Sequence, residues 1–466
     1  MFKKLFYLFG TLPCALYSQI DLGTPIATGK GGVATAITHD WQCIGINPAN
    51  LGYSDNYKFS LGLLNVGFSA QSKALDMTTI YNAALHPTNS FTSADKQKLA
   101  EQLSTADGLN IYGNVNWIAA SLYVPKLGGF AFNVRDRVNG HATLSKNTAD
   151  IIFNGANSIP YQDTSIYHQP VGYVLNGTHA SYYHYREMNI SYGRKIIGSE
   201  ESIQLFGGIG FKYLWGIADM DFKADGNKID GHASFSSNYG FNPTYIKNYT
   251  AQTTDNIFNT VGKGYAFDIG TGLKIKNNLT FAASITDMGA INWNKNNVIA
   301  MDTTMPKLDT SQTGISHWDA NSLPGFLYNS VTNAVSLKGG SPYKTQLPTR
   351  LRLGIGLKIG KKILIGADAV MPMNNANGNL ESTFFALGGE INLFGTAKLS
   401  TGVSGNKNYG FSIPMGFTLG TLGITEVYIA TNDVLSYLGL SNHPQLSFAM
   451  AVLRINLKNP LVNEAK

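Results

Sequence analysis

From about residue 56 onward, the sequence is built from segments in which apolar residues alternate with polar or small ones. In one of them Leu351, Leu353 and Ile355 alternate with Arg352 and Gly354. Side chains alternate between the two faces of a strand, so each segment has one continuous apolar face. The segments run for about ten residues or more, as a tilted membrane strand requires, whereas strands of soluble sandwiches usually have about five or six. The pattern predicts membrane-spanning β-strands.

The composition suits a wall with one lipid face and one wet face. Only 14% of the 466 residues are charged, well below the roughly 25% of soluble domains. Glycine occurs 50 times, and aromatic residues make up 11%. No apolar stretch of about 18 residues follows the N-terminus, so no transmembrane helix is expected. The net charge of +6 comes without a lysine or arginine run, so nucleic acid is not an expected partner.

The alternation predicts fourteen strands, an even number, as closed bacterial barrels require. They are expected at 57–70, 112–124, 127–140, 181–197, 201–224, 264–276, 279–293, 348–360, 362–373, 380–393, 395–405, 408–419, 421–432 and 445–457.

The connections between these strands alternate in length. Short turns are expected at 125–126, 197–199, 277–278, 360–361, 394–395 and 420–421. The other connections are longer, except the one near 406, and those at 226–262 and 294–346 look irregular. Short periplasmic turns that alternate with long outer loops are typical of outer-membrane barrels. The predicted fold is an all-β, transmembrane antiparallel barrel.

The N-terminus predicts export. Lys3 and Lys4 precede a short apolar run, and the small Ser18 precedes Gln19, so residues 1–18 read as a cleaved signal peptide. Residues 19–55 form a separate segment rich in small residues, either a tail or a plug inside the lumen, and their apolar content favours the plug. The barrel is assigned to residues 56–458 and a C-terminal tail to 459–466, and the expected location is the bacterial outer membrane.

Two motifs in this N-terminal segment carry a family resemblance. They are Gly32-x-Ala34-x-Ala36-x-x-x-Asp40 and Asn47-Pro48-Ala49-x-Leu51. Together they resemble the N-terminal hatch of the FadL-type outer-membrane transporters. The resemblance implies a fourteen-stranded barrel with a plug that passes long-chain fatty acids and other hydrophobic molecules. It also implies that Asn47, Pro48 and Ala49 gate the path.

Scattered motifs later in the chain resemble a Bacteroidota branch of the same superfamily. They are the segments 284–293, 347–350 and 429–433. Barrels of the PorV type, which serve type IX secretion, resemble the same superfamily. A component of protein secretion or surface assembly, with secretion-system proteins as partners, is therefore the alternative to transport. The other expected partners are outer-membrane lipid, lipopolysaccharide and a small hydrophobic substrate.

Charged residues are expected on the inner face of the barrel. One hypothesis is that they pair with one another and anchor the plug, and the other is that they form a cationic passage for a carboxylate or another anion. The two are compatible. The residues are Arg135, Arg137, Lys212, Asp268, Arg350, Arg352, Lys358, Asp368, Glu390 and Lys398.

Catalytic signatures are missing from the sequence. It contains no G-x-S-x-G motif, no H-E-x-x-H motif and no paired cysteines with metal-ligand spacing. We therefore expect no enzyme activity, no cofactor and no metal. Gly-x-Gly runs such as 208–210 and 354–356 fall on the polar face of predicted strands. They are interpreted as small lumen residues beside a plug or in a curved wall, and not as phosphate loops.

Overall fold

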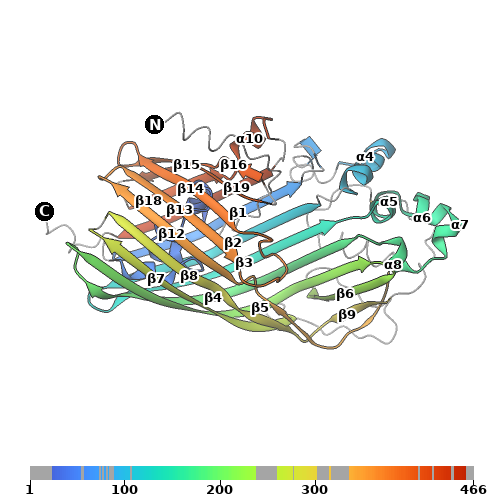
Figure 1. The fold of residues 1–466 in the computed structure, drawn as a ribbon, viewed down its shortest axis with the longest axis horizontal. Coiled ribbons are helices and arrows are strands. Elements are labelled where there is room, and N and C mark those ends of the chain that lie inside the picture. The colour runs from blue at the N-terminus through green and yellow to red at the C-terminus, as the bar shows by residue number, and fades with distance from the viewer. Residues whose placement is uncertain are drawn as a thin grey trace.

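The strands form one antiparallel sheet that closes on itself, and this closed sheet is called the wall below. The computed structural model describes residues 24–53, 57–72, 75, 78–79, 82, 89–104, 108–237, 260–276, 278–301, 314–315, 335–407, 410–421, 424–441 and 445–457. In this part of the chain each wall strand pairs with the next, and the last pairs with the first in the register Ser60 to Asn456. The wall is therefore closed (Figure 1).

Fourteen strands of the described chain form this wall, which confirms the predicted barrel. They are β1 (Phe59–Ser72), β2 (Leu109–Val124), β3 (Gly128–Thr143), β4 (His179–Gly198), β5 (Ile203–Asp225), β7 (Gly262–Ile275), β8 (Leu279–Trp293), β12 (Arg350–Ile359), β13 (Ile363–Pro372), β14 (Phe384–Asn392), β15 (Ala397–Asn406), β17 (Met415–Thr421), β18 (Thr425–Thr431) and β19 (Gln445–Leu457).

One predicted strand is interrupted. The segment expected at 408–419 divides into β16 (Gly410–Ser412) and β17. Ile413 and Pro414 separate the two pieces. Proline has no N–H to donate to a strand ladder, which accounts for the break.

The outer face of the wall is apolar along most strands. Ile209 and Phe385 are each 61% exposed, and Phe411 is 68% exposed. In a soluble protein so many exposed large apolar side chains would be costly, whereas on a barrel they face lipid. The alternation of the sequence thus appears in the structure as an apolar exterior and a polar interior.

Tight turns close the barrel at one end, and longer connections gather at the other (Figure 1). The short turns use left-handed residues at Lys126, Lys276, Gly360 and Gly395. The longer connections carry the helices α4 (Ser93–Leu103), α5 (Lys146–Asn154), η3 (Gly155–Asn157), α6 (Ile159–Gln162), α7 (Thr164–Tyr167), α8 (Val171–Val174) and α10 (Val434–Tyr437). None of the helices within the described ranges is both long and apolar enough to cross a membrane.

The segments that looked irregular contain regular structure, so that prediction was wrong in part. They hold β6 (Lys228–Phe235), β9 (Asn297–Met301), β10 (Ser336–Gly339) and β11 (Tyr343–Gln346). These short strands pair with β5, β8 and one another, and extend the wall at the long-loop end. Strands of only four to eight residues leave little local signal in the sequence.

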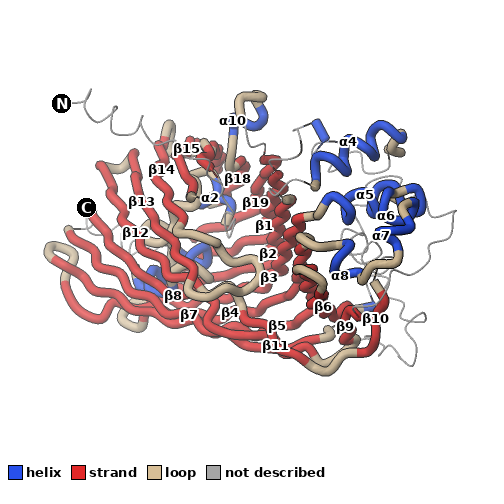
Figure 2. Tube along the Cα trace, turned by 45° about the vertical axis from the view of Figure 1, so that its right-hand side comes forward, coloured by secondary structure: helices blue, strands red, loops and turns tan. Residues whose placement is uncertain are grey.

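The N-terminal segment lies inside the barrel, as the plug interpretation predicted. It contains α2 (Pro25–Thr28), η1 (Asp40–Cys43) and η2 (Pro48–Gly52), and Figure 2 shows α2 enclosed by the strands. Val33, Cys43 and Asn50 have no exposed surface. Residues 24–53 are called the plug below. The signal peptide and the C-terminal tail lie outside the described residues and stay predictions.

Candidate functional site

Glycines on the inner face of the wall make room for the plug. A Cβ placed on Gly208 would lie 2.3 Å from the carbonyl carbon of Pro48. One on Gly270 would lie 2.0 Å from Oδ1 of Asn47. One on Gly388 would lie 2.3 Å from the Lys30 carbonyl oxygen. Several glycines of the Gly-x-Gly runs therefore lie against the plug, whereas Gly210 lies against the wall side chains Ser191 and Asp268.

Asn47 fastens the plug through both ends of its amide. Oδ1 accepts a hydrogen bond from the backbone N–H of Ala49 at 3.1 Å and caps η2. Nδ2 donates to the carbonyl of Thr271 in β7 at 3.1 Å and to that of Thr35 at 3.3 Å. Pro48 occupies the start of η2, where its missing N–H has no cost. The Asn-Pro-Ala motif thus forms a capped turn bonded to the wall.

Asp368 of β13 provides a second attachment. Its Oδ2 accepts hydrogen bonds from the backbone N–H groups of Ala34 and Thr35 at 3.0 and 2.8 Å. The hydroxyl of Thr35 donates to the same oxygen at 2.7 Å. Hydrogen bonds to an ionised carboxylate are about twice as strong as neutral ones. Gly354 of β12 lies opposite Asp368, and Arg352, two residues away on the same strand, interacts electrostatically with Asp368.

A buried ion network crosses five neighbouring strands from β3 to β8. Arg135 Nη2 lies 2.5 Å from Oε1 of Glu187, and Arg137 Nη1 lies 2.9 Å from Oδ2 of Asp287. Lys212 Nζ lies 2.5 Å from Asp287 and 2.9 Å from Asp268. These side chains are at most 4% exposed. Three predicted cations therefore have acidic partners in the lumen.

A second network ties the plug to the strands near the barrel seam. Lys30 of the plug lies 3.5 Å from Glu390, which also lies 3.8 Å from Lys398. On the other side of this network Asp40 pairs with Arg454 of β19. Both plug residues are outside the wall strands. Burial raises the pKa of Asp40, and burial lowers the pKa of Lys30. Each charge depends on its partner in the wall.

Arg350 is bonded to the connection between β13 and β14. Its Nε donates to Oδ1 of Asn379 at 3.1 Å, and its Nη2 donates to the Gly378 carbonyl at 2.9 Å. Arg350 therefore holds the connection between β13 and β14 across the outer end of the lumen.

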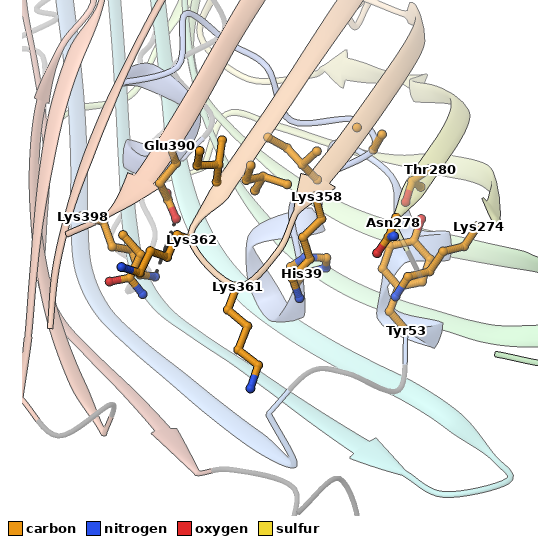
Figure 3. Close-up of a pocket in the computed structure, with 16 residues that line it drawn as sticks. His39, Tyr53, Lys274, Asn278, Thr280, Lys358, Lys361, Lys362, Glu390 and Lys398 are labelled. Atoms are coloured by element: carbon orange, nitrogen blue, oxygen red, sulfur yellow. Dashed lines mark ion pairs between the residues drawn. The ribbon is translucent and has the colours of Figure 1, made fainter. Parts of the chain in front are cut away.

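Lysines gather in a cavity of about 260 Å³ between the plug and the wall, at the end of the barrel with the short turns. We call it the lysine pocket. Figure 3 shows Lys358 between the Glu390–Lys398 pair and Lys274, whose ammonium lies 5.4 Å from the centre of the Tyr53 ring. Glu390 is the only acid among the described residues that line it; the lysines are Lys274, Lys358, Lys361, Lys362 and Lys398. The described lining of this end of the lumen is therefore mainly cationic.

A second cavity, of about 320 Å³, lies at the long-loop end. We call it the mouth pocket. Aromatic rings from β4 and β8 line it, namely Tyr183, Tyr185 and Trp293, together with the carboxylates of Asp219 and Asp221. The two ends of the lumen therefore differ in charge, with acids at the mouth and lysines at the opposite end.

Several acidic partners were not predicted from the sequence. One is Glu187, and another is Glu426, which lies 2.5 Å from Arg454 and 3.3 Å from Lys398. Both lie on the inward parity of predicted strands, so the alternation contained a signal for them. Asp287 was not readable in this way, because β8 changes parity there. Its φ is +60°, and the register between β7 and β8 shifts beside Phe267. A bulge turns the following residues to the other face.

The described residues show no arrangement for a metal. No group of three His, Cys, Asp or Glu side chains among them is placed to hold an ion. The free Cys43 is buried in the plug and donates its Sγ hydrogen to the Asp40 carbonyl at 2.9 Å.

Comparison with solved structures finds two toluene transporters of low similarity. The Pseudomonas putida toluene transporter TodX is 10% identical, with a TM-score of 0.44, over 94% of this chain and 99% of that one. The Ralstonia pickettii toluene transporter TbuX is 11% identical, with a TM-score of 0.45, over 95% and 99%. The fold of this chain is established by its own strand pairing, which runs from β1 round to β19 and back to β1. No curated protein matches the chain.

A family model gives the clearest relationship. It matches residues 48–432, from the Asn-Pro-Ala turn of the plug to the end of β18, and is described as a family of unknown function. The Bacteroidota branch and the PorV-type relationship stay predictions. The match covers most of the chain, which therefore belongs to the family of unknown function DUF5723.

Proposed function

We propose that this protein is a FadL-like channel that passes small hydrophobic molecules, such as fatty acids, across the bacterial outer membrane. In this proposal residues 1–18 are a cleaved signal peptide, and the plug around Asn47, Pro48 and Ala49 gates the path. An apolar solute crosses the polar outer leaflet with difficulty, and a barrel with an aromatic mouth bypasses that barrier.

The observation that carries the proposal is how the lumen is filled. Among the described residues, the segment 24–53 occupies the lumen and is held to the wall by hydrogen bonds and ion pairs. Such attachments are reversible on the timescale of transport, whereas a lumen packed by side chains of the wall itself would be permanently closed. The plug separates the mouth pocket from the lysine pocket. A solute that enters at the mouth must therefore pass the plug.

Locking the plug tests this path. A Cβ on Gly366 of β13 would lie 2.7 Å from Cγ1 of Val33, close to the separation between a sulfur and the partner Cβ in a disulfide. In a Cys43→Ser background, Val33→Cys with Gly366→Cys should therefore form a lock. In a strain that lacks the native protein, the oxidised lock should abolish uptake of labelled fatty acid or toluene, and reduction should restore it.

Val33→Cys alone is the matched control and should transport normally under both conditions. If deletion of the whole protein leaves uptake of fatty acids and aromatic compounds unchanged, the transport proposal is wrong.

A second candidate function is a role in protein secretion or surface assembly. It is favoured by apolar side chains on the helices at the long-loop end, where Ile159 is 55% exposed and Tyr173 is 52% exposed. Exposed apolar groups of this kind are common where proteins dock. Copurification of secretion-system proteins, and loss of surface proteins on deletion, would support it. Normal surface proteins in the deletion strain would exclude it.

A further inference from the structure

Asp219 of β5 is a buried carboxylate at the wall of the mouth pocket. The residue is 3% exposed. Its Oδ2 accepts a hydrogen bond from the hydroxyl of Tyr343 at 3.0 Å. Its Oδ1 takes no hydrogen bond from any described residue. A buried carboxyl group without a cation beside it is driven toward its protonated form, and a cationic ligand beside it would favour the charged form.

A cationic partner for Asp219 is missing from the described chain. No lysine or arginine in the described ranges forms an ion pair with it, and none lines the mouth pocket. Nε2 of His232, on β6 outside the fourteen wall strands, lies 3.7 Å from Oδ2, beyond hydrogen-bond distance. Burial lowers the pKa of His232, which disfavours the charged form of its ring. Asp268 and Asp287, in contrast, both form ion pairs with Lys212.

The neighbouring acid has its own partner. Asp221 lies 3.1 Å from Nε2 of His179, and its side chain is 32% exposed. Asp219 is therefore the carboxylate of this pocket with the greatest deficit of positive charge.

Aromatic rings surround the same space. Tyr183 and Tyr185 stack with their centroids 5.4 Å apart. Trp293 and Tyr343 stack at 6.4 Å across the pocket wall. The guanidinium of Arg137 already lies 5.5 Å from the centre of the Tyr185 ring, on the plug side of the pocket. Aromatic faces attract cations through their quadrupole, and quaternary ammonium groups are recognised by rings of this kind.

We infer that the mouth pocket binds an organic cation, with an alkylammonium group against Asp219 and its carbon substituents against Tyr183, Tyr185 and Trp293. This rests on the proposed function only in taking the mouth as the entry for solutes. A compact metal ion is a poorer occupant, because the described His, Cys, Asp and Glu side chains form no group of three placed to hold one. A neutral hydrocarbon would leave the carboxylate without a counter-charge.

Calorimetry with two probes of equal shape tests the inference. Choline and its uncharged isostere 3,3-dimethyl-1-butanol are titrated into the purified full-length protein in detergent. We expect saturable binding of choline and at least about tenfold weaker binding of the isostere, the difference that one lost charge interaction produces. Equal binding of both probes, or no binding of choline, would overturn the inference, as would calcium binding that excludes choline.

Variants locate the site. Asp219→Asn should weaken choline binding at least about tenfold and leave the isostere unchanged. The control is Asp225→Asn, at the exposed end of the same strand, where the carboxylate pairs with Lys223 at 3.1 Å. It should bind choline like the native protein. If Asp219→Asn does not fold, as judged by its heat-modifiable gel mobility, the probe comparison on the native protein still decides.

Failure of this inference is distinguishable from failure of the transport proposal. Asp219→Asn should leave plug-dependent uptake of neutral toluene intact. We expect this variant to lose choline binding and to keep normal toluene uptake. Unchanged choline binding in Asp219→Asn would show that the proposed cation site is wrong, and it would not affect the transport proposal.

Discussion

Individual charges in the lumen are held in place by specific partners, and the consequences differ between them. Lys212 is fully buried and contacts two carboxylates, Asp268 and Asp287. Asp287 has Arg137 as a second cation, whereas Lys212 is the one cation paired with Asp268 in the described chain. The Asp368 carboxylate, in contrast, accepts hydrogen bonds from the backbone of the plug. One residue stabilises the wall, and the other stabilises the attachment of the plug.

Lys212→Met should destabilise the barrel by about 3 to 5 kcal/mol, because it leaves the buried Asp268 without a cation. The loss is measured as a lower unfolding temperature in detergent, followed by heat-modifiable gel mobility. Lys212→Met with Asp268→Asn should recover much of it, since the unpaired charge is then gone. The exposed Lys223→Met should be neutral, and an equal effect of both lysine changes would contradict the network.

Asp368→Ala should loosen the plug and leave the wall intact. It removes three hydrogen bonds to a charged acceptor, each worth about 1.5 to 3 kcal/mol. Trypsin should then cleave after Lys30, which is 2% exposed in the native protein. Asp225→Ala is the surface control. Unchanged cleavage at Lys30 would show that other contacts hold the plug alone.

At the scale of elements, the wall strands and the plug are shaped for each other. Strands β5, β7 and β14 carry glycines that leave room for the plug. The same strands carry large apolar side chains on the opposite, lipid-facing side, such as Phe211, Tyr265 and Phe385. One face of each strand therefore leaves room for the plug, and the other face contacts lipid. The packing of η2 depends on the glycines that face the plug.

Gly208→Ala should displace η2, because the new Cβ would lie within 2.5 Å of Pro48 and Ala49 backbone atoms. The reporter is Cys43, which has no exposed surface in the native plug. With Cys14 changed to serine, maleimide should label Cys43 much faster in this variant. Gly113→Ala is the matched control, since its Cβ would meet nothing closer than 3.5 Å. Equal labelling in the two variants would argue against tight packing.

At the scale of the whole molecule, closure joins the two ends of the described wall. β1 pairs with β2 on one side and with β19 on the other. The Ser60 hydroxyl of β1 donates to Oδ1 of Asn456 in β19 at 2.7 Å. Closure removes both sheet edges, which a membrane cannot tolerate because unpaired backbone groups have no water there.

Ser60→Cys with Asn456→Cys should form a disulfide across this seam, in a chain in which the native cysteines are serine. The cross-linked chain is circular over almost the whole barrel, so it should migrate faster than the reduced chain after heating in detergent. Ser60→Cys with Ser447→Cys should not cross-link, because Ser447 pairs with Ser69 farther along the strand. Cross-linking of both pairs would contradict the register.

Alternation and connection length in the sequence predicted the number, order and approximate bounds of the wall strands, because these properties are local. The Asn47-Pro48-Ala49 motif and the small residues around it likewise pointed to the plug. The partners in the lumen were harder to predict. Glu187 meets Arg135 across a strand pair, whereas Asp40 meets Arg454 at the far end of the chain. Only closure of the barrel brings that last pair together.

The mouth pocket shows why some of the site was beyond the sequence. Ile209, Phe211 and Tyr213 share the odd parity of Asp219, so alternation alone places Asp219 on the lipid face. The register between β4 and β5 shifts at Tyr185. Gly216 lies opposite Tyr185 and Ala218 lies opposite its neighbour His184, so Ile217 is an extra residue in β5. The extra residue between them reverses the faces above it and turns Asp219 inward. The sequence by itself determined a two-faced wall with a plug. The tertiary structure decided which residues face the lumen, since a bulge depends on the partner strand.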